Sequence, residues 1–379
     1  MMKIELSDAQ QGYKESFRHF ADSYIVPYAQ RHDAEERISE EVLDRLISAG
    51  YLGSMLPTSF GGMGLDMVTV GLLNEEIGRG CSAVRSLLTV HGMAALGILR
   101  FGTADMKAQW LPRMASGKAI GAFALSEPEA GSNAAGVKTT ATRTAGGFLL
   151  NGCKRWITMG QIADLFILFA QLDGKPTAFL VEKANAEGLT VNKMNGFLGA
   201  RGSMIAELQL NDVFVPESHL LGKEGIGVSH VALSCLDYGR YTVAWGCIGT
   251  AQASLEASLH FAKEREQFGQ PIGSNQLIQK MITEMVVTVK SARLLCLQAG
   301  YLKDIGDPDS IMETWNAKYF ASLAANQVSG HAVQIHGARG CHQDFPVERY
   351  FRDAKINEII EGSSQMHEVM IANHALQAL

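Results

Sequence analysis

One carboxylate stands at a break in a helical pattern near the end of the 379-residue chain. Residues 356–370 read INEIIEGSSQMHEVM, and their isoleucine, valine and methionine residues follow helix spacing on both sides of Glu361. Gly362, Ser363 and Ser364 follow it directly, although glycine costs about 1 kcal/mol in a helix interior and serine competes for backbone hydrogen bonds. A break of this kind frees the N–H of Glu361 from the usual helical acceptor. Glu361 is therefore a candidate for chemistry rather than for packing.

Three further segments combine glycine with polar or aromatic residues. ALSEPEAGSNAAGVKT, residues 124–139, predicts a strand end followed by a loop, which is either a surface turn or a holder for a phosphate or a heterocycle edge. KRWITMG, residues 154–160, predicts a strand with Trp156 and Thr158 on one side, where they are either core residues or neighbours of a planar ring. REQFGQPI, residues 265–272, closes a helix with a charged loop. Each segment alone favours a structural role.

Apolar periodicity divides the chain into three zones that must position these residues. Residues 1–115 follow helix spacing. Residues 116–225 contain short alternating or continuous apolar runs between turn residues, which is typical of strands. Residues 226–379 return to long helical stripes. The expected fold is therefore α+β, with an N-terminal helical domain, a middle β domain and a C-terminal helical domain.

Composition excludes several classes of function. Apolar residues make up 47% and charged residues 19%, as in soluble globular proteins, and a net charge of −6 argues against a nucleic-acid partner. The six cysteines form no C-x-x-C pair, and no Rossmann glycine motif, H-E-x-x-H pair or G-x-S-x-G elbow occurs, so we expect reduced thiols and no metal site. Neither a secretory signal nor an apolar run of membrane-spanning length is evident, which predicts a cytoplasmic protein without a membrane span.

Taken together, the order and spacing of the motifs resemble the acyl-CoA dehydrogenase family of flavoproteins over essentially the whole chain. The motifs that carry the resemblance are ALSEPEAGS, KRWITMG, LGARGS, HFAKEREQFGQPIGSNQLIQ, AVQIHGARG, FPVERYFRDAKI and IIEGSSQ. The resemblance implies a middle domain like a β-barrel and a C-terminal four-helix bundle, assembled as a homodimer or homotetramer. It also implies FAD as the cofactor and an electron-transfer acceptor as a partner.

The same resemblance implies a role for each site residue. Glu361 would remove the α-proton of an acyl thioester while flavin N5 accepts a hydride, and its backbone N–H, with a flavin ribityl hydroxyl, would hold the thioester oxygen. Ile359 and Ile360 would desolvate this carboxylate and raise its pKa. The flavin ring would contact Leu125, Ser126, Trp156 and Thr158, and the pyrophosphate would lie near Gly131 and Ser132. The adenosine half would bind, from the neighbouring subunit, Arg265, Gln267, Phe268, Gln334 and Gly337. The residues that complete the cofactor site would be Ser363 and Gln365.

The residues around Arg85 help to predict which acyl group the protein binds. Arg85 and Ser86 interrupt an apolar stretch that forms the floor of the acyl pocket in the family. A buried guanidinium needs a counter-charge, because burying it unpaired is costly. The partner is either a protein carboxylate such as Glu75 or Glu76, or a carboxylate or other polar end of a short substrate, and we favour the substrate. Near the mouth of the pocket, the residues that would steer the substrate are Asp237 and Arg240.

Two subfamilies share this arginine. One is glutaryl-CoA dehydrogenase, which VRSLLTVHG, RYTVAWG and NQLIQK resemble. The other comprises acyl-carrier-protein dehydrogenases that help to make hydroxymalonyl, methoxymalonyl or aminomalonyl extender units for polyketides. The tail at residues 353–376 resembles the second group, and Ile360 stands where glutaryl enzymes generally carry tyrosine. We therefore expect a short polar acyl thioester on a carrier protein. The alternatives are glutaryl-CoA or another short acyl-CoA, or an inert flavin-binding scaffold.

Overall fold

The computed structural model describes residues 5–377, and its first part is helical. Ser7 and Gln10 form a capping box at the start of the first helix, and Asp66 caps the fourth. The N-terminal helices are α1 (Asp8–Tyr24), α2 (Ala29–Glu35), α3 (Glu40–Ser48), α4 (Met67–Gly80), α5 (Ser82–Phe101) and α6 (Ala104–Ala115).

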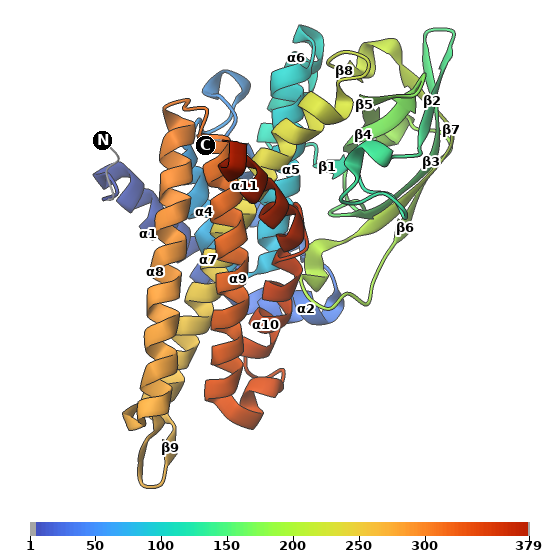
Figure 1. Ribbon diagram of the computed structural model, residues 1–379. Helices are drawn as coiled ribbons and strands as arrows, with labels where there is room; N and C mark the ends of the chain where they lie inside the picture. Colours follow the sequence, from blue (N-terminus) through green and yellow to red (C-terminus); the bar gives the residue numbers. More distant parts are fainter. Residues whose placement is uncertain (1–4, 378–379) are drawn as a thin grey trace.

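A twisted sheet follows, and it forms the separate lobe beside the helices in Figure 1. Its strands are β1 (Gly121–Ala124), β2 (Thr140–Thr144), β3 (Gly147–Ile157), β4 (Leu165–Leu172), β5 (Lys175–Glu182), β6 (Leu189–Lys193), β7 (Ala206–Pro216) and β8 (Leu220–Leu221). The order is β6-β7-β3-β2-β4-β5-β8, and β1 pairs with β4 in parallel. Alternate residues of β7 face a buried apolar layer, which gives its sequence a period of two, whereas β4 is buried on both faces and reads as a continuous apolar run.

The last part of the chain returns to long helices packed side by side (Figure 1). They are α7 (Leu233–Glu264), α8 (Gln276–Asp304), α9 (Ser310–His336), α10 (Val347–Asn357) and α11 (Ser364–Gln377). A small hairpin of β9 (Glu266–Gln267) and β10 (Gln270–Pro271) joins α7 to α8 at the end of the bundle far from the sheet. The expected fold class, helical, then β, then helical, is confirmed.

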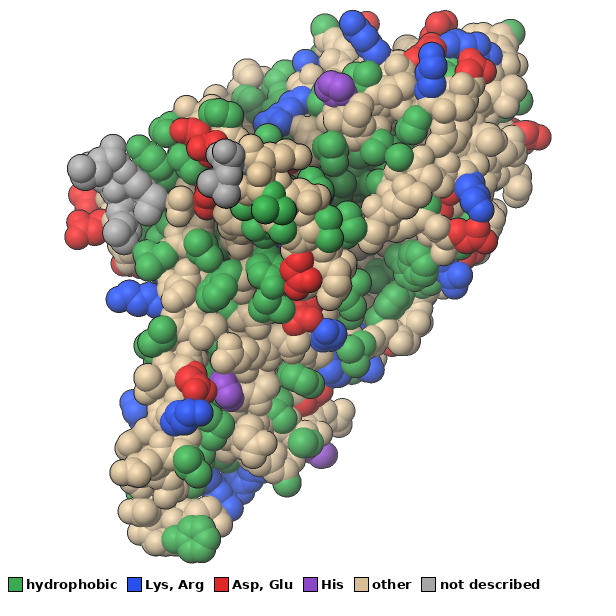
Figure 2. All heavy atoms as spheres, in the orientation of Figure 1, with side chains coloured by type: hydrophobic (Ala, Val, Ile, Leu, Met, Phe, Trp, Pro, Cys, Tyr) green, Lys and Arg blue, Asp and Glu red, His purple; other side chains and the backbone are tan. Residues whose placement is uncertain are grey.

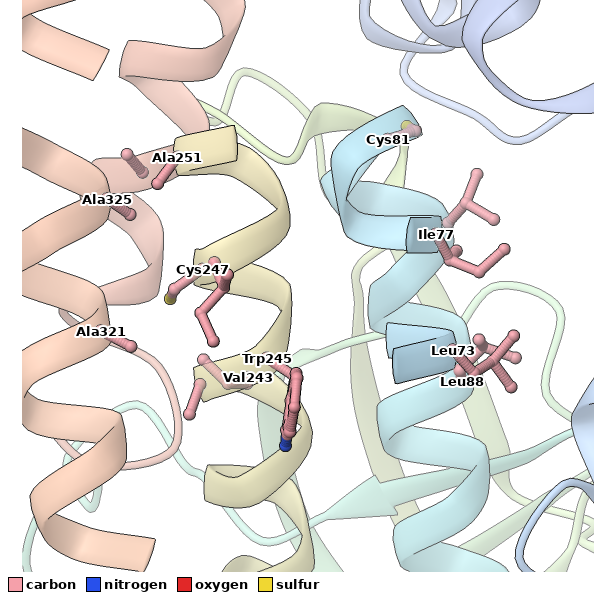
Figure 3. Packing of buried hydrophobic residues seen from close by; sticks show 14 of the residues in the cluster. Leu73, Ile77, Cys81, Leu88, Val243, Trp245, Cys247, Ala251, Ala321 and Ala325 are labelled. Carbon is pink, nitrogen blue, oxygen red and sulfur yellow. The ribbon is translucent and has the colours of Figure 1, made fainter. Parts of the chain in front are cut away.

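Helix α7 lies at the centre of the helical region, and small residues let its neighbours approach it. Ala321 and Ala325 of α9 face Cys247 and Ala251 of α7 in Figure 3. On another side, a Cβ added to Gly78 of α4 would lie 2.9 Å from the Cα of α7 Gly246. Glycine permits this backbone contact because it has no side chain. The close packing fixes the helices that carry the candidate site.

Helix α5 has the length and hydropathy of a membrane span, although no apolar run of that length was expected from the sequence. Nearly all of it is buried inside the protein, where it packs against α4, α6 and α7 and against β1. Its buried polar residues include Arg85 and His91. A buried core helix satisfies the same criteria of length and composition, and the packing of α5 is that of a core helix.

Candidate active site

The predicted break at Glu361 is present between α10 and α11. Glu361 adopts a left-handed backbone conformation with φ 55°, and Gly362 follows with φ 100°. The N–H of Ser364 donates to the carbonyl of Glu358 at 3.1 Å and closes the turn. Within residues 5–377, no acceptor is recorded for the N–H of Glu361. The segment therefore presents a carboxylate together with a free backbone donor.

One oxygen of the Glu361 carboxylate is enclosed, although the residue as a whole is half-buried. Its Oε2 is buried without a hydrogen-bond partner in the described chain, and it lies so close to the Cα of Gly239 on α7 that any larger residue there would overlap it. Burial raises the pKa of Glu361 to about 7. The expectation that Ile359 helps to desolvate this group is wrong, because its side chain is 57% exposed, whereas Ile360 packs partly against the core. A base whose pKa lies near 7 is well matched to proton abstraction at neutral pH.

Two buried cations donate hydrogen bonds to the backbone of the Glu361 turn. Arg240 Nε donates to the carbonyl of Glu361 at 3.2 Å, and Lys318 Nζ donates to the carbonyl of Gly362 at 2.7 Å. The Arg240 guanidinium also stacks 4.0 Å from the ring centroid of Trp315. Lys318 is fully buried, has no carboxylate within ion-pair range in the described residues, and has a pKa lowered by burial to about 8. Lys318 was not identified from the sequence, because a lone lysine on a helix usually lies in solvent.

Arg85 is buried and faces neutral oxygen atoms only. Its side chain donates from Nη1 to Thr89 Oγ1 at 2.9 Å and from Nη2 to Ser86 Oγ at 3.3 Å and Asn357 Oδ1 at 3.2 Å. Its Nε is buried without a partner in residues 5–377. Burial lowers the pKa of Arg85, although its ordinary pKa is so high that the group stays charged. Thr89 and Asn357 were not identified from the sequence.

The alternative in which Glu75 or Glu76 neutralises Arg85 is wrong. Glu75 pairs with Arg293 of α8 at 2.5 Å, and Glu76 pairs with Arg79 at 2.7 Å. Both carboxylates are buried and therefore engaged elsewhere. The guanidinium of Arg85 keeps its charge without a protein counter-ion among the described side chains.

The base and this guanidinium lie along one face of α7. Glu361 contacts Gly239, and a Cβ added to Gly246 would lie 2.7 Å from Arg85 Nε. The two glycines are seven positions apart, so they share a helix face and lie about 10 Å from each other. Between them, Thr242 Oγ1 lies 3.0 Å from the hydroxyl of Thr89. The face offers a base at one end, a cation at the other and hydroxyl groups between.

The two residues expected at the pocket mouth both have partners within the chain. Arg240 is buried and bonds to the backbone of the Glu361 turn, as described above. Asp237 is half-buried and pairs with Lys303 of α8 at 2.5 Å. Arg240 therefore acts on the base, whereas Asp237 is part of an ion pair between helices.

The aromatic residue predicted beside the flavin is exposed on the middle domain. Trp156 is 44% exposed and adopts φ 61°, at a point where the pairing of β3 with β7 shifts register. The regular strand predicted for Trp156 and Thr158 is thus interrupted, and β3 ends at Ile157. A large aromatic ring held outward in a sparsely populated conformation is expected at a ligand site rather than in a core.

The loop after β1 is held by a buried ion pair. Lys154 Nζ donates to Glu127 Oε1 at 2.7 Å and to the carbonyl of Leu125 at 3.1 Å. The carboxylate of Glu127 also accepts the N–H groups of Lys138 at 2.5 Å and Thr139 at 3.0 Å. The expected flavin contacts in this loop comprise buried Leu125, half-buried Ser126, and exposed Gly131 and Ser132. The ordered loop and the exposed Trp156 fit the flavin half of FAD.

The residues expected at the adenosine half lie at the other end of the bundle. Phe268, at the tip of the β9–β10 hairpin, is fully exposed. The ends of α7 and α9 meet there, with the rings of Phe261 and His336 stacked at 4.2 Å. The expected contacts that this end carries are Arg265, Gln267, Phe268, Gln334 and Gly337. The residues expected at the flavin half and those expected at the adenosine half of FAD therefore do not meet within one chain. This separation is expected if the adenosine-half residues bind the FAD of a neighbouring subunit.

Two further expected cofactor contacts lie directly after the base. Ser363 Oγ accepts the N–H of Met366 at 3.4 Å at the start of α11, and Gln365 is exposed in its first turn. Both lie beside Glu361 and not at the adenosine end.

Family models match the chain in three consecutive parts. They describe the acyl-CoA dehydrogenase N-terminal domain at residues 7–118, the middle domain at residues 122–213 and the C-terminal domain at residues 227–376. The short-chain specific acyl-CoA dehydrogenase of Rattus norvegicus mitochondria is 37% identical over 99% of this chain and 92% of its own length.

Solved structures of similar proteins cover the chain almost completely. Butyryl-CoA dehydrogenase from Megasphaera elsdenii is 34% identical with a TM-score of 0.95, covering 99% of this chain and 100% of that one. A glutaryl-CoA dehydrogenase in complex with glutaryl-CoA is 34% identical with a TM-score of 0.96, covering 100% and 98%. FkbI, for biosynthesis of the methoxymalonyl extender unit of the polyketide Fk520, is 32% identical with a TM-score of 0.88, covering 97% and 99%.

Proposed function

The chain belongs to the acyl-CoA dehydrogenase family, and from that premise we propose that it oxidises a short acyl-CoA carrying a carboxylate at the far end of its acyl group. The family membership makes it an FAD-dependent oxidoreductase acting on a CH–CH bond. The choice of acyl group rests on the charges of the site.

The observation that carries the proposal is the uncompensated guanidinium of Arg85. It is 1% exposed and bonded only to neutral oxygens. Leaving a charge buried without a counter-ion is costly, so such a group is expected where a ligand supplies the opposite charge. A straight-chain acyl group would bury this cation further without compensating it. A terminal carboxylate would form a charge-assisted contact with it.

The distance along α7 limits the length of the acyl group. The glycines that contact Glu361 and Arg85 are about 10 Å apart along the helix. A contact of about 3 Å at each end leaves about 4 Å between the reacting carbon and the far carboxylate. That space holds about three carbon–carbon bonds of about 1.5 Å each in a zigzag chain. A five-carbon dicarboxylic acyl group such as glutaryl fits this span better than a malonyl group.

The residues of the chain divide the work between them. Arg85 binds the far carboxylate and thereby sets the position of the α-carbon near Glu361. The free N–H of Glu361 holds the thioester oxygen as charge develops on it, and its carboxylate takes the α-proton. When bound, FAD supplies the acceptor for the hydride that leaves the β-carbon, so a carbon–carbon double bond forms. Ile360 offers no proton, so no second acid or base stands beside Glu361 in that direction.

A comparison of two CoA esters tests the proposal. Purified holoenzyme is assayed with glutaryl-CoA and butyryl-CoA, which are both short, using a dye as electron acceptor. We expect kcat/KM to be at least about tenfold higher for glutaryl-CoA, which corresponds to about 1.4 kcal/mol. Equal values, or a preference for butyryl-CoA, would overturn the assignment of a carboxylate-bearing substrate. Analysis of the acyl product and of released CO₂ then shows whether the double bond forms with or without decarboxylation.

A second candidate is the same oxidation on a carrier protein, as predicted from the sequence. Its support is the similarity to FkbI together with the tail resemblance. The relatives from Rattus norvegicus and Megasphaera elsdenii, which are more similar to this chain than FkbI is, are named as CoA enzymes, and this favours CoA as the carrier. The two candidates are separated by offering one acyl group on CoA and on a phosphopantetheinylated carrier protein. A kcat/KM at least tenfold higher on the carrier protein would favour this second candidate.

We also propose that the chain forms a homo-oligomer. Hydrophobic side chains gather over α8, α9 and α11 on the face drawn in Figure 2. The exposed apolar residues on these helices are Leu277, Val286, Val287, Leu294, Ile311, Leu323, Val369, Met370 and Leu376. The placement of the adenosine-half residues at the far end of the bundle supports the same assembly. Sedimentation of the holoenzyme as a monomer would contradict it.

A further inference from the structure

We infer that Asn357 is a specificity-determining positioning residue: it holds Arg85 through a neutral acceptor and so leaves the guanidinium charge available for the substrate. The inference rests on the proposed function, because it concerns the same end of the acyl site. Asn357 is the last residue of α10 and is 1% exposed. Its Oδ1 accepts from Arg85 Nη2 at 3.2 Å, across 272 positions of sequence.

The chemistry of the acceptor is what matters. A carboxylate at position 357 would hold Arg85 more strongly but would neutralise it. An amide of nearly the same shape holds the guanidinium in place without cancelling its charge. Thr89 and Ser86, the other acceptors, are also neutral. These three neutral acceptors therefore orient Arg85 and leave its charge available for the substrate.

Carboxylates lie close by in sequence, but each is turned elsewhere. Glu358, the next residue, accepts from Asn326 at 2.5 Å and pairs with Lys355 at 2.6 Å. Asp353, one turn earlier, accepts the N–H of Ala200 at 2.6 Å. The only position of α10 that reaches Arg85 by a recorded hydrogen bond, within the part of the chain described, is thus occupied by an amide.

Asn357 also offers a donor of its own. Its Nδ2 is buried and has no hydrogen-bond partner in residues 5–377. A buried amide donor without a partner is costly unless a ligand or water accepts from it. A substrate carboxylate has two oxygens, so it can accept from Arg85 and Asn357 together. Because Asn357 lies four residues before Glu361, the contact also links the far end of the substrate to the turn that carries the base.

The test is the isosteric change Asn357→Asp in the holoenzyme. The introduced carboxylate faces Arg85, neutralises it and repels the substrate carboxylate. We expect the ratio of kcat/KM for glutaryl-CoA to kcat/KM for butyryl-CoA to fall about 30-fold or more. The matched control is Asn192→Asp, an exposed residue of β6, which should leave both constants and the ratio unchanged.

A second variant separates charge from packing. Asn357→Leu removes the acceptor and the donor without adding charge, so the ratio should fall by a smaller factor, about three- to tenfold. If Asn357 only supports packing, leucine should harm the ratio as much as aspartate, or neither should change it, and either result overturns the inference. If Asn357→Asp does not retain flavin, an unchanged ratio in Asn357→Leu overturns it instead. A wild-type enzyme without preference for glutaryl-CoA contradicts the proposed function itself, and is recognised before any variant is made.

Discussion

Two groups of buried charges in this protein differ in how they are compensated. In the middle domain, Lys154 and Glu127 are both buried, lie 2.7 Å apart and have further partners in the backbone. In the helical region, Arg85 and Lys318 are equally buried but have no carboxylate within ion-pair range in the described residues. The charges of the first group are balanced by each other, whereas those of the second group are not balanced by a carboxylate in the described residues.

The difference separates structure from function. A compensated buried pair is maintained by its own geometry, and it fixes the loop that carries Leu125 and Ser126. Uncompensated cations reduce stability unless another species supplies negative charge. Arg240, Lys318 and Arg85 all lower the pKa of Glu361. The cations therefore define a region prepared for an anionic substrate.

Removing the base should have the largest effect on turnover. Glu361→Gln should lower kcat by about 10⁴-fold, about 5.5 kcal/mol, in a dye-linked assay. Because the pKa of Glu361 is raised to about 7, above its ordinary value of 4.5, the folded state binds the proton more tightly, and stability falls as pH rises from about 4.5 to 7. Glu361→Gln should therefore be more stable than the wild type above pH 7, by on the order of 1–3 kcal/mol, in thermal denaturation. A variant that keeps substrate-dependent flavin bleaching would exclude Glu361 as the base.

Breaking the compensated pair should have the next largest effect, on stability. Lys154→Met leaves the buried carboxylate of Glu127 without its cation and should cost about 3–5 kcal/mol in denaturant unfolding. The double variant Lys154→Met/Glu127→Gln removes both charges and should recover part of the loss. Flavin content should fall with the single variant, since the loop loses the anchor at the Leu125 carbonyl. Unchanged stability would mean that the pair is not the fixed structural element described above.

Removing the charge of Arg85 should change substrate specificity but should not lower stability. Arg85→Met should lower the glutaryl-CoA to butyryl-CoA ratio of kcat/KM by about 100-fold, about 2.7 kcal/mol, while thermal stability stays equal or rises. The matched control is Arg293→Met, which removes the partner of buried Glu75 and should lower stability. If Arg85→Met is as destabilising as Arg293→Met, the two groups of charges do not differ in the way proposed.

The sequence predicted the fold and part of the site for identifiable reasons. Helix and strand periodicities differ strongly between the zones, and the glycine and serines after Glu361 interrupt an otherwise regular helix. Arg85 was recognisable because it is a charge in an apolar helix. These signals are local, because each of them can be read from one segment of the sequence.

The remaining features depend on distant contacts. Asn357 reaches Arg85 across 272 positions, and Lys318 reaches Gly362 from another helix, so neither is marked by its own neighbours in sequence. Alternation predicted one side of a strand for Trp156 and Thr158, but a shift in register gives Trp156 φ 61°. The exposure of Ile359 depends on how the turn after α10 folds, which hydrophobicity alone does not determine.

The smallest expected effect concerns Lys318, the second uncompensated cation. Protonated Lys318 lowers the pKa of Glu361, in opposition to burial, which raises it. Lys318→Met should therefore raise the pKa of Glu361 and move the acid limb of the kcat/KM profile to higher pH. At pH 7 the variant should be roughly threefold less active. The two profiles should converge above pH 8, where wild-type Lys318, with a pKa of about 8, loses its own charge.

The pH profile distinguishes an electrostatic role of Lys318 from a purely structural one. Lys318 also donates to the carbonyl of Gly362, so its loss could simply loosen the turn. A loosened turn would lower kcat/KM at every pH, whereas loss of the charge shifts the acid limb and leaves the high-pH plateau close to that of the wild type. Lys290→Met, at an exposed position of α8, should change neither. If the high-pH plateau of kcat/KM falls and the acid limb does not shift, Lys318 has a structural role, as Lys154 has. Arg85 would then be the remaining buried cation that the substrate must neutralise.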